Sequence, residues 1–368
     1  MAVLEPVVDA PTLAREHSRA ALTDMADASD ARAPQVTTVA DDHAVVHWGP
    51  AWKQYDDLQP DTDYTFDGVE FRTLPRPPGE RLSTVATVND VHFGETVCGY
   101  ESEMPQAGPH FSSEPGEPPY PETMNGAAVD EIVALDPDAV VVKGDLTADG
   151  LDEEYEAFLR CYQGALGDKL HHIRGNHDAY RGQTYAPSEP FAVTLPGVVL
   201  AVLDTTTPFS ATGTLDADQL DWLDAVAGEA DRPVLAFGHH HPWAPGSRNR
   251  AETYFGIRPD DSEALVAVAE RRPAIAGYFA GHTHRNRVRH FAATANMPWA
   301  EIACVKDFPG AWAEYRIYEG GILQVFHRIR RPDALEWSDR TRVMFGGLYE
   351  GYAFGQLTDR CFEVPLRF

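Results

Sequence analysis

The 368-residue chain has few cysteines, few basic residues and no long apolar segment. Its four cysteines, Cys98, Cys161, Cys304 and Cys361, form no CxxC pair, which argues against a structural zinc site or a dithiol redox site. We expect reduced thiols, although the spacing also allows one disulfide. No segment approaches the ~18 apolar residues of a transmembrane helix, and the N-terminus lacks the basic start and continuous apolar stretch of a signal peptide. These absences predict a soluble, cytoplasmic protein with no membrane contact.

The shortage of basic residues makes the chain strongly acidic. It has 30 Lys and Arg residues against 57 Asp and Glu residues, a formal net charge of −27. Such a charge repels nucleic-acid polymers and anionic membranes, although the basic strip Arg285–Arg289 could still contact a phosphate. Hydrophobic residues make up 43% of the chain, which is enough for a sizeable core. The sequence leaves the oligomeric state open, a homo-oligomer included.

Composition divides the chain into four segments. Residues 1–34, rich in Ala and Asp, predict an irregular or partly helical segment. Short β-branched and aromatic runs predict a small antiparallel β unit over residues 35–80, and its Leu58–Tyr64 stretch resembles part of a fibronectin type III domain. We expect the principal domain over residues 81–330 and an irregular, aromatic-rich tail packed on the core over residues 331–368. The Pro- and Gly-rich segment 95–121 is either a functional loop or a surface insertion.

In the principal domain, five apolar runs end directly at polar blocks. The runs are Ser83–Val88, Ala139–Val142, Leu170–Ile173, Val234–Phe237 and Ile275–Phe279. Helical patterns lie between them, which indicates an α/β sheet covered on both faces, with ligands bound beyond the carboxyl ends of the strands. We expect a second sheet, packed on the first, from the runs Val198–Leu203, Ala300–Cys304, Ala313–Tyr318 and Ile322–His327.

The polar blocks after the five runs carry oxygen and imidazole ligands. They are Asp90-Val91-His92, Gly144-Asp145, Gly175-Asn176-His177-Asp178, His240-His241-Pro242 and Gly281-His282-Thr283-His284. Each block alone is common in turns, so the inference rests on the occurrence of all five blocks in this order. Asp90 and His92, two apart at a strand end, should point to one side, and the two oxygens of Asp145 could bridge two ions. Mixed oxygen and nitrogen ligands without thiolate suit Mn, Fe, Zn or Co.

The five blocks, in this order, resemble the signature of the calcineurin-like metallophosphoesterases: Asp-x-His, Gly-Asp, Gly-Asn-His-Asp/Glu, His and Gly-His-x-His. The resemblance implies a four-layer α/β/β/α (α+β) sandwich extending to about residue 330, and two divalent or mixed-valence ions of Mn, Fe or Zn. It places one ion among Asp90, His92, Asp145 and His284, and the other among Asp145, Asn176, His240 and His282. The family ligand lies two residues before Pro242, which selects His240, so His239 and His241 are expected to point elsewhere.

The resemblance implies hydrolysis of a phosphate ester. Two cations about 3.5–4 Å apart hold the attacking and leaving oxygens, and a bridging hydroxide serves as the nucleophile. His177 is expected to stabilise the transition state or protonate the leaving oxygen. We expect Asp178 to accept a hydrogen bond from His177 and orient its ring, or to cap a helix. Arg174 is expected either to contact phosphate or to pair with an acid.

The run Gly144–Gly150 indicates which branch of the family the chain resembles. It lacks the Arg of protein Ser/Thr phosphatases, and it has Ala148 where purple acid phosphatases carry a metal-bound Tyr. Its Gly-Asp-Leu-Thr-x-x-Gly form looks most like class III cyclic nucleotide phosphodiesterases and their bacterial relatives. The leading hypothesis is therefore a phosphodiesterase acting on small organic phosphates or cyclic nucleotides. A phosphomonoesterase and a catalytically silent metal-binding scaffold are the alternatives.

Overall fold

The computed structural model describes residues 33–100, 106–251 and 253–367. The segment predicted over residues 1–34 lies outside the described residues except for its last two positions. All four cysteines are free thiols, as expected. Within the described ranges, no helix combines the length and the apolar character needed to cross a bilayer.

The first of two six-stranded sheets has the strand order β17-β16-β15-β6-β7-β8. Its parallel half consists of β6 (Arg81–Val88), β7 (Ala139–Lys143) and β8 (Leu170–Ile173). Parallel neighbours need long crossovers, which α2 (Tyr120–Leu135), α3 (Asp152–Leu166) and the short η2 (Gly167–Lys169) provide. The antiparallel half consists of β15 (Ala311–Tyr318), β16 (Gly321–Arg328) and β17 (Phe362–Val364).

The second sheet has the order β13-β14-β12-β11-β10-β9. Its central strands β10 (Val198–Val202), β11 (Val234–Phe237), β12 (Ile275–Ala280) and β14 (Trp299–Glu301) are parallel, and the edge strands β9 (Phe191–Leu195) and β13 (Arg287–Arg289) are antiparallel to their neighbours. The helices α5 (Ala217–Glu229) and α6 (Pro259–Arg271) and the short η3 (Ala292–Thr294) connect these strands.

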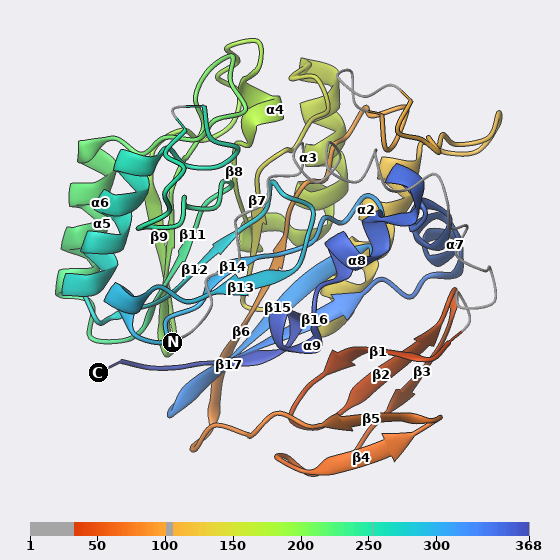
Figure 1. Ribbon diagram of the computed structural model, residues 1–368, viewed down its shortest axis with the longest axis horizontal. Helices are drawn as coiled ribbons and strands as arrows, with labels where there is room; N and C mark the ends of the chain where they lie inside the picture. The colour runs from red at the N-terminus through yellow and green to blue at the C-terminus, as the bar shows by residue number, and fades with distance from the viewer. Residues whose placement is uncertain (1–32, 101–105, 252, 368) are drawn as a thin grey trace.

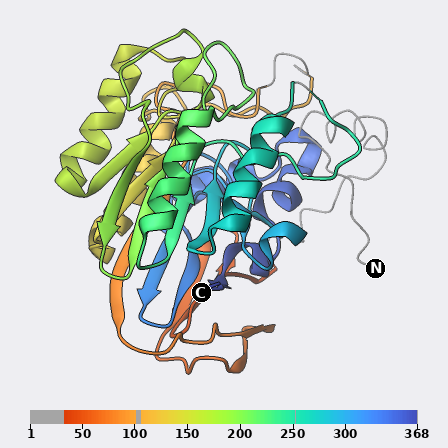
Figure 2. The ribbon, with the colours of Figure 1, turned by 90° about the vertical axis from the view of Figure 1, so that its left-hand side faces the viewer.

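The two sheets pack face to face, with helices on their outer faces (Figure 1). Side chains alternate along each strand, so Val85 and Val141 enter the core between the sheets, while Ala86 and Val140 face α2 and α3. In the same way, β10 and β11 contribute to both the inter-sheet core and the core beneath α5 and α6. Figure 2 shows α5 and α6 side by side over the second sheet. The four-layer α/β/β/α arrangement is thus confirmed.

The predicted membership of the two sheets is wrong in one respect. The sequence predicts that all five runs preceding the polar blocks lie in one sheet. In the structure β6, β7 and β8 lie in the first sheet, whereas β11 and β12 lie in the second. Conversely, β15 and β16 extend the first sheet by pairing with β6. The polar blocks therefore approach one another from both sheets.

The predicted β unit contains five strands in two small antiparallel sheets, of orders β1-β2-β3 and β4-β5. The strands are β1 (Gln35–Val39), β2 (Ala44–Trp48), β3 (Ala51–Tyr55), β4 (Asp63–Phe66) and β5 (Val69–Arg72). Val39 and Phe71 share a buried cluster with Phe326 of β16, and Arg316 of β15 pairs with Asp41 at 2.6 Å. The unit thus shares a core with the principal domain.

The C-terminal stretch, predicted to be irregular, is mostly regular structure. It forms α7 (Pro332–Thr341), η4 (Phe345–Gly347), α8 (Tyr349–Phe354), α9 (Leu357–Arg360) and β17. Trp337 of α7 stacks on Tyr120 of α2, and β17 completes one edge of the first sheet. The stretch packs on the core as regular elements of the fold.

Candidate metal centre

The predicted ligands lie at the carboxyl ends of five strands, β6, β7, β8, β11 and β12. The first three strands belong to one sheet and the last two to the other, so the site lies along the seam between the sheets. Lys143, fully buried at the end of β7, crosses this seam and donates from Nζ to the carbonyl oxygen of Ala280 on β12 at 3.0 Å. Burial lowers the pKa of Lys143 to about 7.

The backbone at the site is unusual. Five of the predicted ligands have positive φ values between 48° and 70°, namely Asp90, His92, Asp145, His282 and His284. This left-handed conformation is uncommon in residues other than glycine, and such strain concentrates at functional sites. Asp90 and His92 do converge, but not because they lie on an extended strand end, as expected. Strand β6 stops at Val88, and both residues have left-handed backbone conformations that direct their side chains inward.

The first cluster consists of Asp90, His92, Asp145 and His284, whose donor atoms all lie within 4.8 Å of one another. Nε2 of His92 is 3.4 Å from Oδ2 of Asp145, and Nε2 of His284 is 3.6 Å from Oδ1 of Asp90. Both ring nitrogens of His92 are buried without a hydrogen-bond partner. Burial lowers the pKa of His92, so its ring is neutral and can present a lone pair. This donor set fits a metal ion.

The second cluster brings together His239, His240 and His282, again within 4.8 Å. Nε2 of His240 and Nε2 of His282 are buried without a hydrogen-bond partner, and burial holds the pKa of both rings well below its ordinary value. Nδ1 of His240 contacts the Thr205 hydroxyl at 2.8 Å, a contact of the kind that orients metal-binding histidines. Oδ1 of Asn176 borders the cluster, 3.0 Å from Nε2 of His239.

The histidine triplet differs from expectation at one position. His241 points away and contacts the Tyr254 hydroxyl at 2.9 Å, as expected of a neighbour of His240. His239, however, enters the second cluster together with His240. Strand β11 ends at Phe237, so the strict alternation of a β-strand does not apply to the triplet.

His177 lies at the edge of the site, half-buried. Its ring is 4.5 Å from that of His92, and its Nδ1 contacts the carbonyl oxygen of Ala148 at 2.6 Å. A carbonyl can only accept, so Nδ1 carries a proton and Nε2 is the nitrogen left for a substrate. The ring is thus oriented by a backbone carbonyl.

The expectation that Asp178 orients His177 is wrong. The Asp178 carboxylate accepts hydrogen bonds from the backbone of Gly175, Leu146 and Thr147 and from the Thr147 hydroxyl. It caps the short helix α4 (Asn176–Ala179) and ties it to the loop after Asp145. Burial raises the pKa of Asp178 to about 6. Its role is to fix the loops that carry Asp145 and Asn176.

Arg174 pairs with an acid, which was one of the two alternatives. Its Nη2 lies 2.6 Å from Oδ2 of Asp204, and its Nη1 donates to the carbonyl oxygen of Gln183 at 3.0 Å. Both side chains are largely buried, with exposed fractions of 11% and 5%. Arg174 therefore braces the loop around the site.

A second buried network lies behind His284 and has no motif in the sequence. Lys306 pairs with Glu95 at 2.7 Å and with Asp307 at 3.1 Å, and Oδ2 of Asp307 lies 3.9 Å from Nδ1 of His284. Burial would raise the pKa of Asp307, but Lys306 and His284 hold it at about 2. An ionised carboxylate on this side favours the orientation of His284 toward Asp90.

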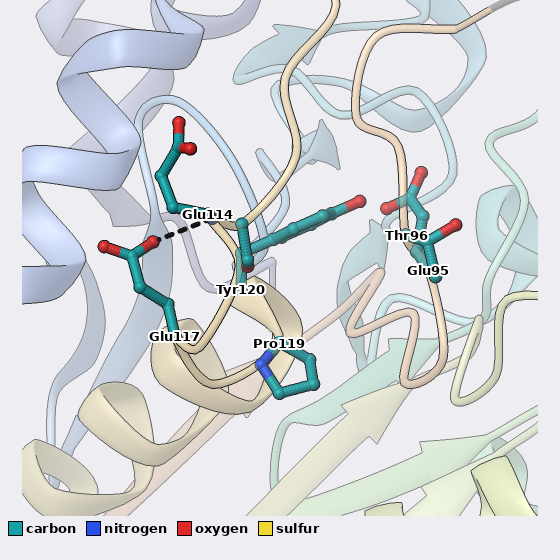
Figure 3. Close-up of a pocket in the computed structure, with 7 residues that line it drawn as sticks. Glu95, Thr96, Glu114, Glu117, Pro119 and Tyr120 are labelled. Carbon is teal, nitrogen blue, oxygen red and sulfur yellow. Dashed lines mark hydrogen bonds between the residues drawn. The ribbon is translucent and has the colours of Figure 1, made fainter.

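The segment 95–121 contributes to a pocket of about 220 Å³ that begins at Glu95, three residues after His92. Figure 3 shows the Tyr120 ring between Glu114 and Glu117 on one side and Thr96 and Glu95 on the other. Tyr120 is fixed from behind by the stacked Trp337. Residues 95–100 and 106–121 of this segment are therefore packed onto the fold beside the first cluster.

Comparisons with known proteins identify the family of the chain. The calcineurin-like phosphoesterase family model matches residues 83–286, more than half of the chain. Glycerophosphodiester phosphodiesterase GpdQ of Enterobacter lignolyticus is 32% identical over 197 residues, which cover 50% of this chain and 68% of that protein. A probable cyclic nucleotide phosphodiesterase of Synechococcus sp. is 30% identical over 189 residues, 50% of this chain and 72% of that protein.

Among solved structures, a dimetal phosphatase from Danio rerio superposes with a TM-score of 0.50 at 16% identity, over 68% of this chain and 98% of that one. This likeness concerns the fold. The match over residues 83–286 shows the family, and the two ligand clusters described above fit it. The chain belongs to the calcineurin-like phosphoesterase family and is a phosphoester hydrolase.

Proposed function

We propose that the protein is a dinuclear metal-dependent phosphodiesterase that acts on small organic phosphates. The observation that carries the proposal is the position of one atom, Oδ2 of Asp145. It lies 3.4 Å from Nε2 of His92 in the first cluster and 3.3 Å from Nε2 of His239 in the second. A carboxylate oxygen between two ligand clusters is suited to bridge two ions.

The donor set supports this assignment of the ligands. Asp90, His92, Asp145 and His284 would hold one ion, and Asp145, Asn176, His240 and His282 the other. The set contains oxygen and nitrogen but no thiolate, which suits divalent or mixed-valence Mn, Fe or Zn. Bound there, the ions would lower the pKa of water and neutralise charge on the phosphoryl group.

The chain's own residues supply the remaining chemistry. His177 presents Nε2 because Nδ1 is engaged by Ala148, and a proton on Nε2 would be donated to the leaving oxygen of the ester. Asp178 and Arg174 keep the surrounding loops in place through Thr147 and Asp204. With a net charge of −27 on the chain, attraction of a phosphate depends on the ions at this site.

The substrate class rests on the relatives. The two relatives described above are named for phosphodiesters, glycerophosphodiesters in one case and cyclic nucleotides in the other. The proposal therefore favours diesters over monoesters. The negative net charge of the chain disfavours long nucleic acids as substrates.

A substrate panel combined with metal analysis tests the proposal. We expect about two metal ions per chain, and faster hydrolysis of bis(p-nitrophenyl) phosphate, glycerophosphodiesters or cyclic nucleotides than of p-nitrophenyl phosphate. Higher activity on the monoester would instead support a phosphomonoesterase. Two bound ions with no hydrolysis of any ester would support the silent scaffold.

A further inference from the structure

His239 is the fully buried residue of the second cluster that the family signature does not include. Its ring lies against Gly144, where an added Cβ would come within 2.6 Å of Nδ1. Gly144, which precedes Asp145, thus leaves the space that the imidazole fills, and Gly175, which precedes Asn176, leaves space for the Asp145 carboxylate. The positions of the two ring nitrogens are therefore defined by the packing of the ring.

Hydrogen bonding fixes the tautomer of a neutral His239. Nδ1 lies 2.8 Å from the carbonyl oxygen of Lys143, which can only accept, so Nδ1 carries the proton. Nε2 then presents a lone pair. It faces Oδ1 of Asn176 at 3.0 Å and Oδ2 of Asp145 at 3.3 Å.

The two oxygens facing Nε2 are themselves acceptors. Asn176 donates from Nδ2 to the Tyr180 hydroxyl at 2.7 Å, which turns its Oδ1 toward His239. Asp145 accepts the backbone N–H of His177 at Oδ1, which leaves Oδ2 directed at the clusters. A neutral His239 would therefore bring three lone pairs to one point, and that arrangement is repulsive unless a proton on Nε2 or a metal ion lies among them.

Two further nitrogens face the same space. Nε2 of His240 and Nε2 of His282 are buried without a hydrogen-bond partner, and the rings of both residues lie 4.9 Å and 5.1 Å from that of His239. A proton on Nε2 of His239 would place a second positive charge against any ion held by these rings. A lone pair at the same atom would attract that ion.

We propose that His239 is a direct ligand of the second metal ion, in addition to Asp145, Asn176, His240 and His282. The inference rests on the proposed dinuclear site. It gives the second ion three imidazole nitrogens and the first ion two. Nitrogen-rich sites favour Zn or Fe over Mn, so the two positions should differ in metal preference.

Metal binding to the apoprotein tests the proposal without reference to turnover. Wild type, His239→Leu and His239→Gln are titrated with Zn²⁺ by calorimetry and loaded with ¹¹³Cd²⁺ for NMR. The matched control is His47→Gln, because His47 is another fully buried histidine, located in the β unit away from the site. The resonance of the second ion is identified as the one that disappears in His282→Ala.

We expect both His239 variants to retain the first ion and to bind the second about 10- to 100-fold more weakly. The second ¹¹³Cd resonance should move in His239→Gln, because an imidazole nitrogen has left the ion, and the first should stay in place. Retention of the first ion shows that each variant is folded. His47→Gln should behave as wild type.

Each other outcome has a definite meaning. Unchanged affinity for both ions in the His239 variants would overturn the inference while leaving the dinuclear proposal intact. Weaker binding with an unmoved ¹¹³Cd resonance would also overturn it, because His239 would then only position Asn176 and Asp145. Fewer than two ions in the wild type would instead contradict the proposed function itself.

Discussion

Oδ2 of Asp145 lies 3.4 Å from Nε2 of His92, and this contact joins residues that follow two neighbouring parallel strands, β7 and β6. Burial would raise the pKa of the Asp145 carboxyl, but in the metal-free protein a protonated His239 and the nearby His177 hold it well below its ordinary value. The carboxylate is therefore ionised near neutral pH. Its charge faces both ligand clusters.

Replacing that charge tests the bridging position. In Asp145→Asn the size and shape of the side chain are nearly kept, but the negative charge is lost. We expect affinity for both ions to fall and turnover to drop by more than ~100-fold, since even groups that only orient a ligand contribute about 10- to 100-fold. Metal analysis after gel filtration and initial rates on bis(p-nitrophenyl) phosphate measure the effects.

Asp149→Asn is the matched control, because Asp149 is exposed in the same loop. It should retain both ions and full activity. A variant at Asp145 that keeps two tightly bound ions would contradict the bridging role.

His177→Ala should separate catalysis from metal binding. If Nε2 of His177 protonates the leaving oxygen, its loss should lower kcat by about 10²- to 10⁴-fold for esters with alkoxide leaving groups. The loss should be much smaller for p-nitrophenyl esters, because p-nitrophenolate leaves without a proton. Metal content should be unchanged.

The leaving-group dependence distinguishes this role from a structural one. His171→Ala, on the preceding strand, provides a control that should leave both substrate classes unaffected. An equal loss on both classes would indicate that His177 only shapes the site, and loss of metal would make it a structural support of the ligands.

Much of the site could be predicted from the sequence because its blocks are local. Asp90-Val91-His92 and Gly281-His282-Thr283-His284 each follow an apolar run directly, so strand ends and ligands are encoded together. The pairing of strands is not local. Val234–Phe237 and Ala139–Val142 are both short, apolar and buried, and nothing in either run specifies which sheet it joins.

The features that were missed depend on contacts distant in sequence. His239 enters the second cluster because the chain leaves β11 at Phe237, and the space for its ring comes from Gly144, which follows β7. Asp178 had a local alternative as a helix cap, which its bond from the Gly175 N–H supports, whereas its contacts with Leu146 and Thr147 have no local signal. The helix α7 carried a local signal that could have been used, since Pro332 occupies its first turn.

The pair of Arg174 and Asp204 should contribute to stability. Arg174→Met leaves Oδ2 of Asp204 buried without its cation, which we expect to lower the free energy of unfolding by about 3 kcal/mol. Asp204→Asn keeps a side-chain oxygen for the contacts with Thr206. The double variant, Arg174→Met with Asp204→Asn, should recover part of the stability that Arg174→Met loses. Urea denaturation of the four proteins gives the coupling energy.

The alternative role of Arg174 was contact with phosphate. Steady-state kinetics on Arg174→Met decide between the two roles. An unchanged KM with reduced stability supports the ion pair, whereas a raised KM with unchanged stability would contradict it.

The pH dependence of stability should carry a signature of His47. This ring is fully buried in β2, with Nδ1 on the Thr37 hydroxyl at 2.8 Å. Burial, with Arg328, Arg330 and Arg342 nearby, lowers its pKa from 6.5 to about 2. The folded protein therefore keeps the ring neutral, while the unfolded chain takes up a proton below pH 6.5. Stability is then lost as the pH falls, because the unfolded state binds more protons.

His47→Gln removes this contribution. Between pH 7.5 and 5, the unfolding free energy of the wild type should fall by about 2 kcal/mol more than that of the variant, at 1.36 kcal/mol for each unit below 6.5. Urea denaturation of both proteins at the two pH values, saturated with the same metal, gives the difference, and contributions from the other histidines cancel. An equal fall of the unfolding free energy in the two proteins would mean that His47 is protonated in the folded state, in conflict with its burial among three arginines.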